Sequence, residues 1–413
     1  MNLALPLSKT SVIEGERGSY RLLQKIFEGG MGIVWEAEST EDKRHLIVKQ
    51  PHVGEGDRRI TFERLVYEAK ILRYINDAMN DQASNNSQHL IRQHVVRYVD
   101  HTEDQPEPFL VLEFVNGPTM IDAFREKPAP ETIALQYAAM LLKVVGALHY
   151  HGIIHRDISP SNIILNPRRG IVLIDFGTCQ TLKPITGTHP PRYGRVILKR
   201  GFSAPELLQG HSDERSDIFS VGATLFFLLT GKNPGDFMSD TQVMTTTLQA
   251  VDKKISQTVS SIVETALSPD PNHRFRTATA MAAAIETTTP KGPRVVVGQF
   301  SFELKPGYTD IGRDHVCDDD CKSLGFTRTP QIRIADPKKY IEKHHARIWL
   351  QDDGRCMIEG LKSVNRTAIK SKTGQTRILH PSEKIELQDN DIVALAYNPT
   401  RGPYSTIEFK RDK

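Results

Sequence analysis

Two short strings in the middle of the chain combine residue types that phosphoryl chemistry uses. The first, residues 155–162, puts Asp157 and Asn162 on one tight loop, and the second is Asp175-Phe-Gly. Asp157 is suited to accept the proton of a substrate hydroxyl, and Asn162 and Asp175 offer the oxygen ligands that Mg²⁺ prefers. Together they predict transfer of a phosphoryl group to a hydroxyl with Mg²⁺ (or Mn²⁺) as cofactor and ATP as co-substrate.

A glycine-rich string lies nearer the N-terminus, between two runs of β-forming residues. Gly29, Gly30 and Gly32 lack a Cβ, so their backbone amides can approach a polyphosphate closely, and Val34 follows them. Taken alone, the string is more typical of a flexible hairpin. It predicts a nucleotide site because matching residues follow at suitable intervals.

Lys49 and Glu68 are those matching residues. Lys49 ends a β-like run, where a lysine can contact the α- and β-phosphates of ATP, and Glu68 lies in an amphipathic helix from which it can pair with Lys49. Taken singly, each is more typical of a solvated surface side chain. It is very improbable that chance alone would place the glycines, Lys49, Glu68 and the two strings in this order.

Hydrophobic periodicity predicts the elements that position these residues. Strands are expected at 20–27, 32–38, 45–50 and 109–114, and a polar surface loop at 78–87. Helices are expected where apolar residues share a face (Phe62, Leu65, Val66, Ala69 and Leu72; then Ile133, Tyr137, Leu141, Val144 and Leu148). The segment 217–229 is apolar nearly all round, which indicates a helix buried inside its domain.

The hydrophobic pattern changes after Ile285, where the helical period ends. A stretch rich in Thr, Pro and Gly predicts a linker at 288–294. Beyond it the period is two, with strands expected at 346–350, 356–360, 392–396 and 406–410. Residues 295–411 are therefore expected to form an all-β antiparallel sandwich.

Composition sets the class of protein. The chain has 413 residues, 38% hydrophobic and 25% charged, with a net charge of +3, so two globular domains are expected and neither nucleic acid nor a membrane is an expected partner. No run reaches the ~20 apolar residues of a membrane span. The N-terminus lacks a secretory pattern, and four cysteines make no disulfide framework. A cytoplasmic location is expected.

Residues 20–287 resemble a eukaryotic-type serine/threonine protein kinase. Further motifs support this: Ala204-Pro-Glu206 resembles the end of the activation segment, Asp217 the anchor of the catalytic loop, and Arg274 the partner of Glu206. The resemblance implies a bilobal α+β fold with an N-lobe at 20–115 and a C-lobe at 116–287, after an N-terminal extension at 1–19. Glu113 and Val115 then lie in the hinge, where backbone groups bond adenine.

The resemblance also implies roles for the site residues. Asp157 is the catalytic base, Asn162 and Asp175 hold the metal, Lys49 holds the phosphates and Glu68 holds Lys49. Pro160 in the loop is typical of the serine/threonine branch. Arg156 is expected to grip a phosphate on the activation segment, for which Thr186 and Thr188 are the candidate autophosphorylation sites.

Three positions depart from the family pattern. Phe27 replaces the first glycine of the phosphate loop, Ser159 stands where these kinases carry a lysine, and Lys199 stands where they carry a threonine. Because a lysine and a hydroxyl have exchanged places, we expect Lys199 to reach toward Asp157 and the γ-phosphate while Ser159 supplies the hydroxyl.

The C-terminal region resembles a forkhead-associated (FHA) domain, a phosphothreonine-binding module. The resemblance is carried by Gly312-Arg313, by 341–348 and by 363–367, and it assigns Arg313, Lys343 and Asn365 to phosphopeptide binding. Glu342 stands at the family's serine position, where its carboxylate repels phosphate. Phosphopeptide binding and its absence both stay open.

Three functions of different classes remain. The first is an active protein kinase, bacterial or phage-encoded, whose second domain recruits a phosphothreonine-containing protein or its own phosphorylated linker, with Thr287, Thr288 and Thr289 as sites. The second is a pseudokinase scaffold, which Phe27 and Ser159 suggest. The third is a kinase of small molecules, against which the complete Ala-Pro-Glu motif counts. The string 315–321, with one His and two Cys, is more typical of a polar loop than of a zinc site.

Overall fold

The computed structural model divides the chain into two compact units, residues 1–288 and 289–413. The structure describes residues 11–29, 32–51, 58–78, 86–103, 108–182, 199–288, 292–298, 300–304, 307–313, 330, 332–334, 336, 339–351, 353–361 and 365–411.

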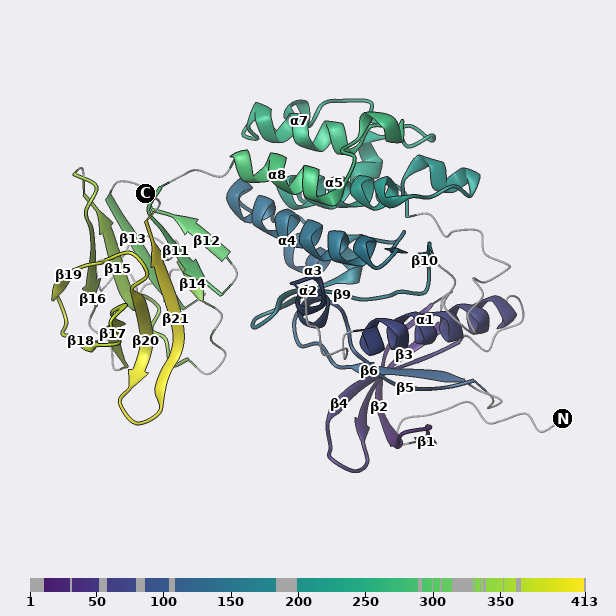
Figure 1. Ribbon diagram of the computed structural model, residues 1–413, viewed down its shortest axis with the longest axis horizontal. Coiled ribbons are helices and arrows are strands. Elements are labelled where there is room, and N and C mark those ends of the chain that lie inside the picture. The colour runs from purple at the N-terminus through teal and green to yellow at the C-terminus, as the bar shows by residue number, and fades with distance from the viewer. Residues whose placement is uncertain are drawn as a thin grey trace. The chain divides into compact units, whose positions relative to one another are not determined.

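The first part of unit 1, the N-lobe, is built on a six-stranded antiparallel sheet (Figure 1). Alternating side chains point into an apolar layer that includes Leu22, Trp35 and Val48, since successive residues of a strand face opposite sides. The strands, in the order β1-β2-β3-β4-β6-β5, are β1 (Val12–Glu14), β2 (Ser19–Gly29), β3 (Gly32–Ser39), β4 (His45–Gln50), β5 (Tyr98–Thr102) and β6 (Phe109–Glu113).

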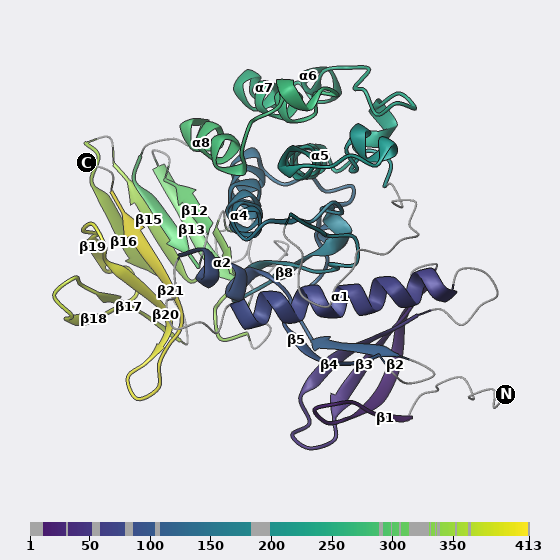
Figure 2. The same ribbon diagram turned by 45° about the vertical axis from the view of Figure 1, so that its right-hand side comes forward.

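Two helices accompany this sheet, and α1 lies along one side of it in both ribbon views (Figures 1 and 2). Helix α1 spans Arg58–Ala78 and α2 spans Asn86–His94. The apolar stripe of α1, including Leu65, Ala69 and Leu72, is buried. This burial fixes the helix face that carries Glu68.

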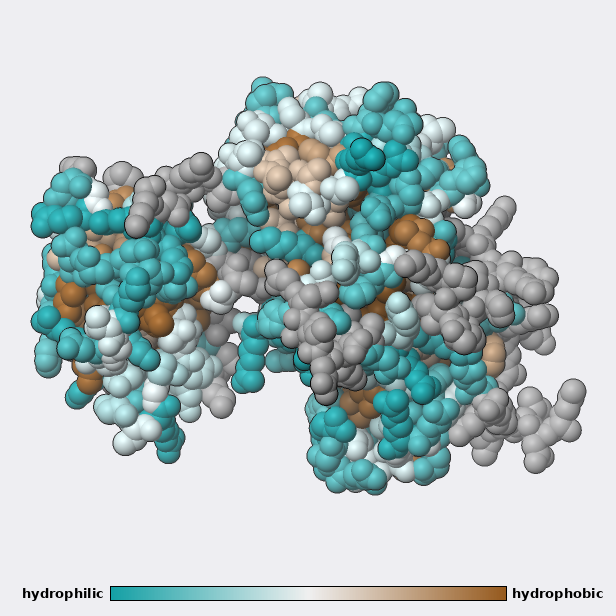
Figure 3. Space-filling model, in the orientation of Figure 1, coloured by the Kyte–Doolittle hydropathy of each residue, from teal (hydrophilic) through white to brown (hydrophobic). Residues whose placement is uncertain are grey.

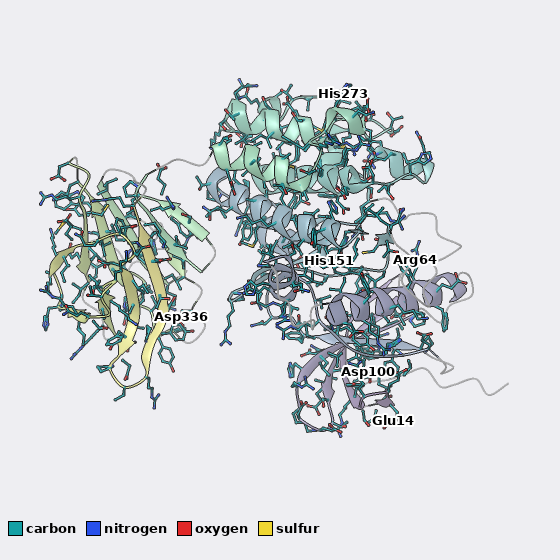
Figure 4. All side chains as sticks on the ribbon, in the orientation of Figure 1. Glu14, Arg64, Asp100, His151, His273 and Asp336 are labelled. Atoms are coloured by element: carbon teal, nitrogen blue, oxygen red, sulfur yellow. The ribbon has the colours of Figure 1, made fainter. Side chains whose placement is uncertain are left out.

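Three predictions for the N-lobe are corrected. Residues 12–14 of the expected extension form β1, which pairs with β2, and the buried Asp100 holds their connection by accepting bonds from Arg17 N–H and from Tyr20. Figure 4 labels Glu14 and Asp100 in this part of the N-lobe. Strand β5 was not expected. The expected loop at 78–87 is bounded by helix at both ends, and residues 79–85 lie outside the described part.

The C-lobe is mainly helical, and α4, α5, α7 and α8 lie together in both ribbon views (Figures 1 and 2). Asp213 and Ser216 form a capping box at the start of α5, and Gly231 ends it in the left-handed conformation. The helices are α3 (Met120–Phe124), α4 (Glu131–Tyr150), α5 (Glu214–Thr230), α6 (Leu248–Val251), α7 (Gln257–Ala266) and α8 (Ala278–Thr288), with short 3₁₀ helices at Pro160–Asn162, Pro205–Gln209, Pro234–Phe237 and Pro271–His273. The strand pairs are β7 (Ile153–Ile154) with β10 (Gln180–Thr181) and β8 (Ile163–Asn166) with β9 (Gly170–Leu173).

Helix α4 is the one helix of the described residues that is long and apolar enough to cross a membrane. Its most apolar window is 61% buried inside the protein, so core packing accounts for the hydropathy. The face of each unit seen in Figure 3 is mostly hydrophilic, and apolar atoms show in smaller groups.

The end of α8 corrects the linker prediction. The helix continues to Thr288, beyond Ile285, where the apolar period ends. The hydroxyls of Thr287 and Thr288 donate to the carbonyls of Ala284 and Ile285, both at 2.7 Å, and the Ile285 carbonyl is one of the four left open at the C-terminus of this helix. Thr289 lies outside the described residues, and strand β11 already begins at Arg294.

Unit 2 is a sandwich of two sheets around one core, which includes Ile348, Leu395 and Phe409. Its strands are antiparallel except that β13 and β14 run parallel, which corrects the fully antiparallel expectation. One sheet has the order β12-β11-β21-β20-β17-β18, and the other β14-β13-β15-β16-β19. The strands are β11 (Arg294–Val297), β12 (Phe300–Glu303), β13 (Gly307–Arg313), β14 (Ile332–Ile334), β15 (Ala346–Leu350), β16 (Cys356–Gly360), β17 (Arg366–Lys370), β18 (Thr376–Leu379), β19 (Lys384–Glu386), β20 (Ile392–Asn398) and β21 (Gly402–Lys410).

Candidate active site

The loop between β7 and β8 brings a carboxylate, an amide and an ammonium group together. Asn162 Nδ2 donates to both the backbone oxygen and Oδ2 of Asp157, each at 2.8 Å. Lys199 Nζ donates to the same Oδ2 at 2.9 Å, to Ser159 Oγ at 3.2 Å and to Ser161 Oγ at 3.3 Å. The sequence-predicted residues of this loop therefore form one hydrogen-bonded group, which Ser161 joins.

Burial adjusts the acidity of the Asp157 carboxyl. Asp157 is buried, and burial raises its pKa to about 6, although Lys199 and the hydrogen bond from Asn162 act in the opposite direction. The group is thus a stronger base than an exposed aspartate, as proton acceptance from a hydroxyl requires.

A second charged group joins the N-lobe to the Asp-Phe-Gly motif. Lys49 Nζ lies 2.7 Å from Glu68 Oε1 and 3.7 Å from Asp175 Oδ1. Burial alone lowers the pKa of Lys49, but Asp175 and Glu68 outweigh burial and raise it above its usual value. Phe176 N–H donates to Glu68 Oε1 at 3.2 Å, so strand β4, helix α1 and the motif are coupled.

Two residues of this region have a left-handed backbone, which costs energy for any residue with a Cβ. Both Arg156 and Asp175 have φ of +66°. Asp217, at 0% exposure, accepts Arg156 N–H at 2.8 Å and His155 N–H at 2.9 Å, and His149 also contacts it at 2.8 Å. Strain of this kind persists where surrounding bonds over-determine the loop, and Asp217 provides such bonds.

The end of the activation segment is anchored by an ion pair with two parallel bonds. Arg274 Nη1 and Nη2 donate to Glu206 Oε1 and Oε2, both at 2.8 Å, and Ser216 Oγ donates to Oε1 at 2.7 Å. Burial raises the pKa of Glu206, but Arg274 and Ser216 outweigh it and keep the pKa below its usual value. Such paired geometry is the strongest form of this interaction and fixes the residues after Lys199.

The glycine-rich loop joins β2 to β3. Gly32 has φ of +132°, and a Cβ there would lie 2.2 Å from the carbonyl oxygen of Gln50, so only glycine fits. A Cβ on Gly29 would lie only 2.7 Å from Cζ of the Phe27 ring. The ring of Phe27 therefore fits because residue 29 is a glycine. Gly30 lies outside the described residues.

The remaining nucleotide-site residues lie on neighbouring strands and on the segment that joins the lobes. Val34 pairs with Lys49 across β3 and β4. Glu113 ends β6, and Val115, which follows it, is buried. Sequence reasoning missed Arg169, whose side chain contacts Glu113 at 2.6 Å, because no motif marks its turn.

The donor set fits a divalent cation. Because the amide nitrogen of Asn162 bonds Asp157, its carbonyl oxygen is the end of the amide that can face a cation. Asp175 adds carboxylate oxygens, and burial there is outweighed by Lys49 and Lys199, which keep its pKa below the usual value. These are the hard oxygen ligands of Mg²⁺. Among the described residues, no group of three or more His, Cys, Asp and Glu side chains is arranged to hold a metal ion.

Arg156 contacts neutral groups in the structure. Its Nε donates to Thr178 O at 2.6 Å and its Nη1 to Gln180 Oε1 at 3.3 Å. Ser212 Oγ also donates to Gln180 Oε1. Thr186 and Thr188, the expected phosphorylation sites, lie outside the described residues. Cys179, after the Asp-Phe-Gly motif, is fully buried, and burial raises the pKa of its thiol, so it is not a reactive thiolate.

In unit 2 the expected phosphopeptide residues lie at the end of β13, which Arg313 ends, and in two loops that hold Lys343 and Asn365. Arg313 N–H donates to Glu342 O at 2.9 Å, and a Cβ on Gly312 would lie 2.0 Å from Lys343 O, so glycine is required there. Asn365 Nδ2 donates to Tyr340 O at 2.8 Å, tying the two loops together.

A buried histidine bonds one of these loops to strand β20. His345 is fully buried, with Glu342 N at 3.2 Å and Ala396 N at 3.1 Å from its ring nitrogens. Burial lowers its pKa to about 4, so the ring is neutral at pH 7. The string 315–321, considered for zinc, lies outside the described residues.

Comparison with known proteins gives two domain families and a set of relatives. The protein kinase domain family matches residues 20–284, and the FHA domain family matches residues 309–396. Serine/threonine-protein kinase D of Synechocystis sp. is 27% identical over 292 residues, which cover 70% of this chain and 55% of that protein. Serine/threonine-protein kinase PrkC of Bacillus subtilis is 29% identical over 279 residues, covering 65% of this chain and 40% of that protein.

These relatives are bacterial proteins, and the chain spans about half of their length or less. The matched region holds the catalytic loop, the Asp-Phe-Gly motif and the Lys49–Glu68 pair, whose geometry is described above. Because the protein kinase family matches more than half of its residues, this chain belongs to that family, and it carries an FHA domain after the kinase domain.

Proposed function

We propose that the chain is an active, ATP-dependent serine/threonine protein kinase that also phosphorylates itself. The observation that carries the proposal is the joint assembly of Lys49 with Glu68 and Asp175, and of Asp157 with Asn162 and Lys199. Phosphoryl transfer needs positioning and charge neutralisation more than covalent chemistry, and these groups supply both.

In the proposed mechanism Asp157 orients the substrate hydroxyl and accepts its proton as the oxygen bonds the γ-phosphorus, while the bond from that phosphorus to the β–γ bridging oxygen breaks and ADP leaves. Lys49 holds the α- and β-phosphates, and Glu68 holds Lys49 in place. Asn162 and Asp175 would hold Mg²⁺ (or Mn²⁺), which would supply positive charge against the phosphate oxygens. Lys199 adds a cation beside the γ-phosphate, in place of the lysine that the family carries at the position of Ser159.

The substrate class follows from the same residues. The complete Ala204-Pro-Glu206 motif, anchored by Arg274, favours a peptide substrate over a small molecule. Pro160, the first residue of the 3₁₀ turn in the catalytic loop, favours serine and threonine hydroxyls. Since ATP is a cytoplasmic metabolite, the cytoplasm is the proposed location.

The second domain is proposed to bind a phosphothreonine-containing protein or the phosphorylated linker. Arg313, Lys343 and Asn365 are the proposed contacts, and Glu342 weakens them. Tethering gives a linker ligand an effective concentration in about the millimolar range, so weak binding suffices. Thr287 and Thr288 must first leave their hydroxyl bonds in the last turn of α8 before either can serve as a ligand.

Transfer of labelled γ-phosphate from Mg-ATP to a generic protein substrate, with phosphosite mapping, tests the proposal. The wild-type chain is expected to label serine and threonine, and Asp157→Asn is expected to bind ATP without transferring phosphate. Nucleotide binding without turnover in the wild-type chain would establish the pseudokinase instead. Turnover restricted to hydroxyl-bearing small molecules would establish the third function.

A further inference from the structure

Arg169 lies in the turn between β8 and β9, outside every motif described above. Its guanidinium uses all three nitrogens: Nη1 donates to Glu113 Oε1 at 2.6 Å, Nε to Gln93 O at 2.5 Å and Nη2 to Val95 O at 2.9 Å. One side chain of the C-lobe therefore bonds the last residue of β6, the last turn of α2 and the residue that follows α2.

Glu113, whose carboxylate accepts the bond of Arg169 to another side chain, is the first residue of the hinge. Its Oε1 also accepts Arg97 N–H at 3.0 Å, and Glu113 N–H donates to Arg97 O at 3.0 Å. The Glu113 carboxylate is thus held from two sides, by the C-lobe turn and by the start of β5.

The same turn holds the hinge at a second point. Asn166 Nδ2 donates to Asn116 O at 2.9 Å, while its Oδ1 accepts the N–H groups of Arg168 at 3.0 Å and Arg169 at 2.9 Å. The hinge residues 113–116 are therefore bonded at both ends to Asn166 and Arg169, at the end of β8 and in the turn after it, which leaves little freedom for the backbone between them.

The Arg169–Glu113 pair is only partly exposed to water, at 20% and 22% of the side chains. Solvent and salt screen such a pair less than an exposed one. A lysine is a point charge on a flexible stem and cannot reproduce three bonds that diverge from one planar group.

We propose that Arg169 is a positioning residue for the adenine base: it holds the hinge backbone at Glu113–Val115 in the geometry that bonds the nucleotide, and so sets affinity for ATP. The inference rests on the proposed function, in which the hinge is the adenine site. Arg169 touches neither phosphate nor substrate hydroxyl, so its effect falls on ATP affinity and not on the chemical step.

The test compares Arg169→Ala with Arg168→Ala in the full chain. Arg168 is the adjacent residue of equal charge, and its side chain is exposed. KM for ATP, kcat at saturating ATP, direct affinity for a fluorescent ATP analogue and thermal unfolding without nucleotide are measured for each. Loss of a charge-assisted, multiply bonded side chain is expected to raise KM and the dissociation constant about tenfold or more. We expect kcat at saturation to stay close to wild type, and Arg168→Ala to change nothing.

Arg169→Lys and Glu113→Gln keep the test decisive if the alanine variant does not fold. Both should weaken ATP binding by less than the alanine variant. Unchanged ATP affinity in all of these variants, or a fall in kcat with unchanged affinity, would overturn the proposal. Absence of phosphoryl transfer in the wild-type chain would instead count against the proposed kinase activity, since analogue binding still reports on Arg169.

Discussion

The ammonium group of Lys199 lies 2.9 Å from Oδ2 of Asp157. The lysine comes from the activation segment and the aspartate from the catalytic loop, 42 residues earlier in the chain. Lys199 also reaches Ser159, which occupies the position where the family carries a lysine. A lysine and a hydroxyl are thus both present beside Asp157, with their places in the chain exchanged.

Lys199→Ala is expected to lower kcat about a hundredfold, because a cation beside the transferring phosphate is commonly worth a few kcal/mol in the transition state. Affinity for ATP should change little, because Lys49 and the hinge remain. Steady-state kinetics over a range of ATP concentrations separates the two effects.

The exchanged pair provides its own rescue experiment. Ser159→Lys combined with Lys199→Thr restores the family arrangement and should recover part of the lost turnover. Ser159→Lys alone places two ammonium groups side by side, where they repel each other, and should not recover it. Near-normal turnover in Lys199→Ala would mean that Lys199 is an ordinary loop lysine.

The pH dependence of turnover should report Asp157. Its pKa is raised to about 6, chiefly by burial, and the group must be deprotonated to accept the hydroxyl proton. Turnover is therefore expected to rise with pH through about 6 and to level off above it.

Burial raises the pKa of Asp157 and Lys199 lowers it, so a substitution of Lys199 should shift this pKa in a known direction. Lys199→Ala removes that opposing effect, which raises the pKa of Asp157 and moves the acid limb to higher pH. Lys199→Arg keeps the charge and should leave the limb near its wild-type position. The measurement is the pH dependence of kcat for the wild type, Lys199→Ala and Lys199→Arg. If the acid limbs of all three proteins coincide, the assignment of this limb to Asp157 is contradicted.

Sequence reasoning succeeded where a motif or a strong period specifies an element. The strands 45–50, 346–350 and 356–360 have the predicted bounds because alternating residues bury one face of each. It failed where a strand is short or tertiary packing decides, as for β1 and the parallel pair β13–β14. A parallel pairing joins segments far apart in the chain, and no local pattern specifies it.

The same division holds for the site. The contact of Lys199 with Ser159 was expected because these two positions carry exchanged residue types relative to the family pattern. Arg169 carried no such signal, since its three acceptors come from Gln93, Val95 and Glu113, more than 50 residues earlier. Thr288 was assigned to the linker, directly after Thr287, because composition does not reveal the hydroxyl bonds of these two residues within the helix.

Dependence on activation-segment phosphorylation is expected to be weak. Arg156 already donates to two neutral acceptors, Thr178 O and Gln180 Oε1, so the start of the segment is held without a phosphate. We expect the chain treated with a phosphatase, and the Thr186→Ala/Thr188→Ala variant, to keep turnover within about tenfold of the phosphorylated protein, since neutral bonds to a charged group contribute about 1.5–3 kcal/mol each.

Two substitutions at Gln180 sharpen this prediction. Gln180→Ala removes one acceptor and should make turnover more dependent on phosphate, whereas Gln180→Glu places a carboxylate against Arg156 and should make it less so. Turnover of phosphatase-treated and untreated protein is compared for each variant. A wild-type chain that loses its activity entirely on phosphatase treatment would show that the phosphate is indispensable.

Glu342 is expected to be the residue that limits phosphopeptide binding by the FHA domain. Its backbone oxygen accepts Arg313 N–H, so it lies beside the arginine proposed to bind phosphate. A phosphothreonine carries close to two negative charges at pH 7, and a neighbouring carboxylate repels it. Glu342→Ser removes that charge and restores the family's hydroxyl, so affinity for a phosphothreonine peptide should rise about tenfold or more, the size expected for exchanging a repulsive contact for a charge-assisted one.

Glu386, which pairs with Met357 toward the other end of the β15–β16 ladder, provides the matched control Glu386→Ser. Fluorescence anisotropy with the full chain, using phosphorylated and unphosphorylated versions of one peptide, measures the difference. If Glu342→Ser gains no preference for the phosphorylated peptide, or if Glu386→Ser gains as much, then the loops of this domain do not form a phosphothreonine site, and recruitment through it must use another surface.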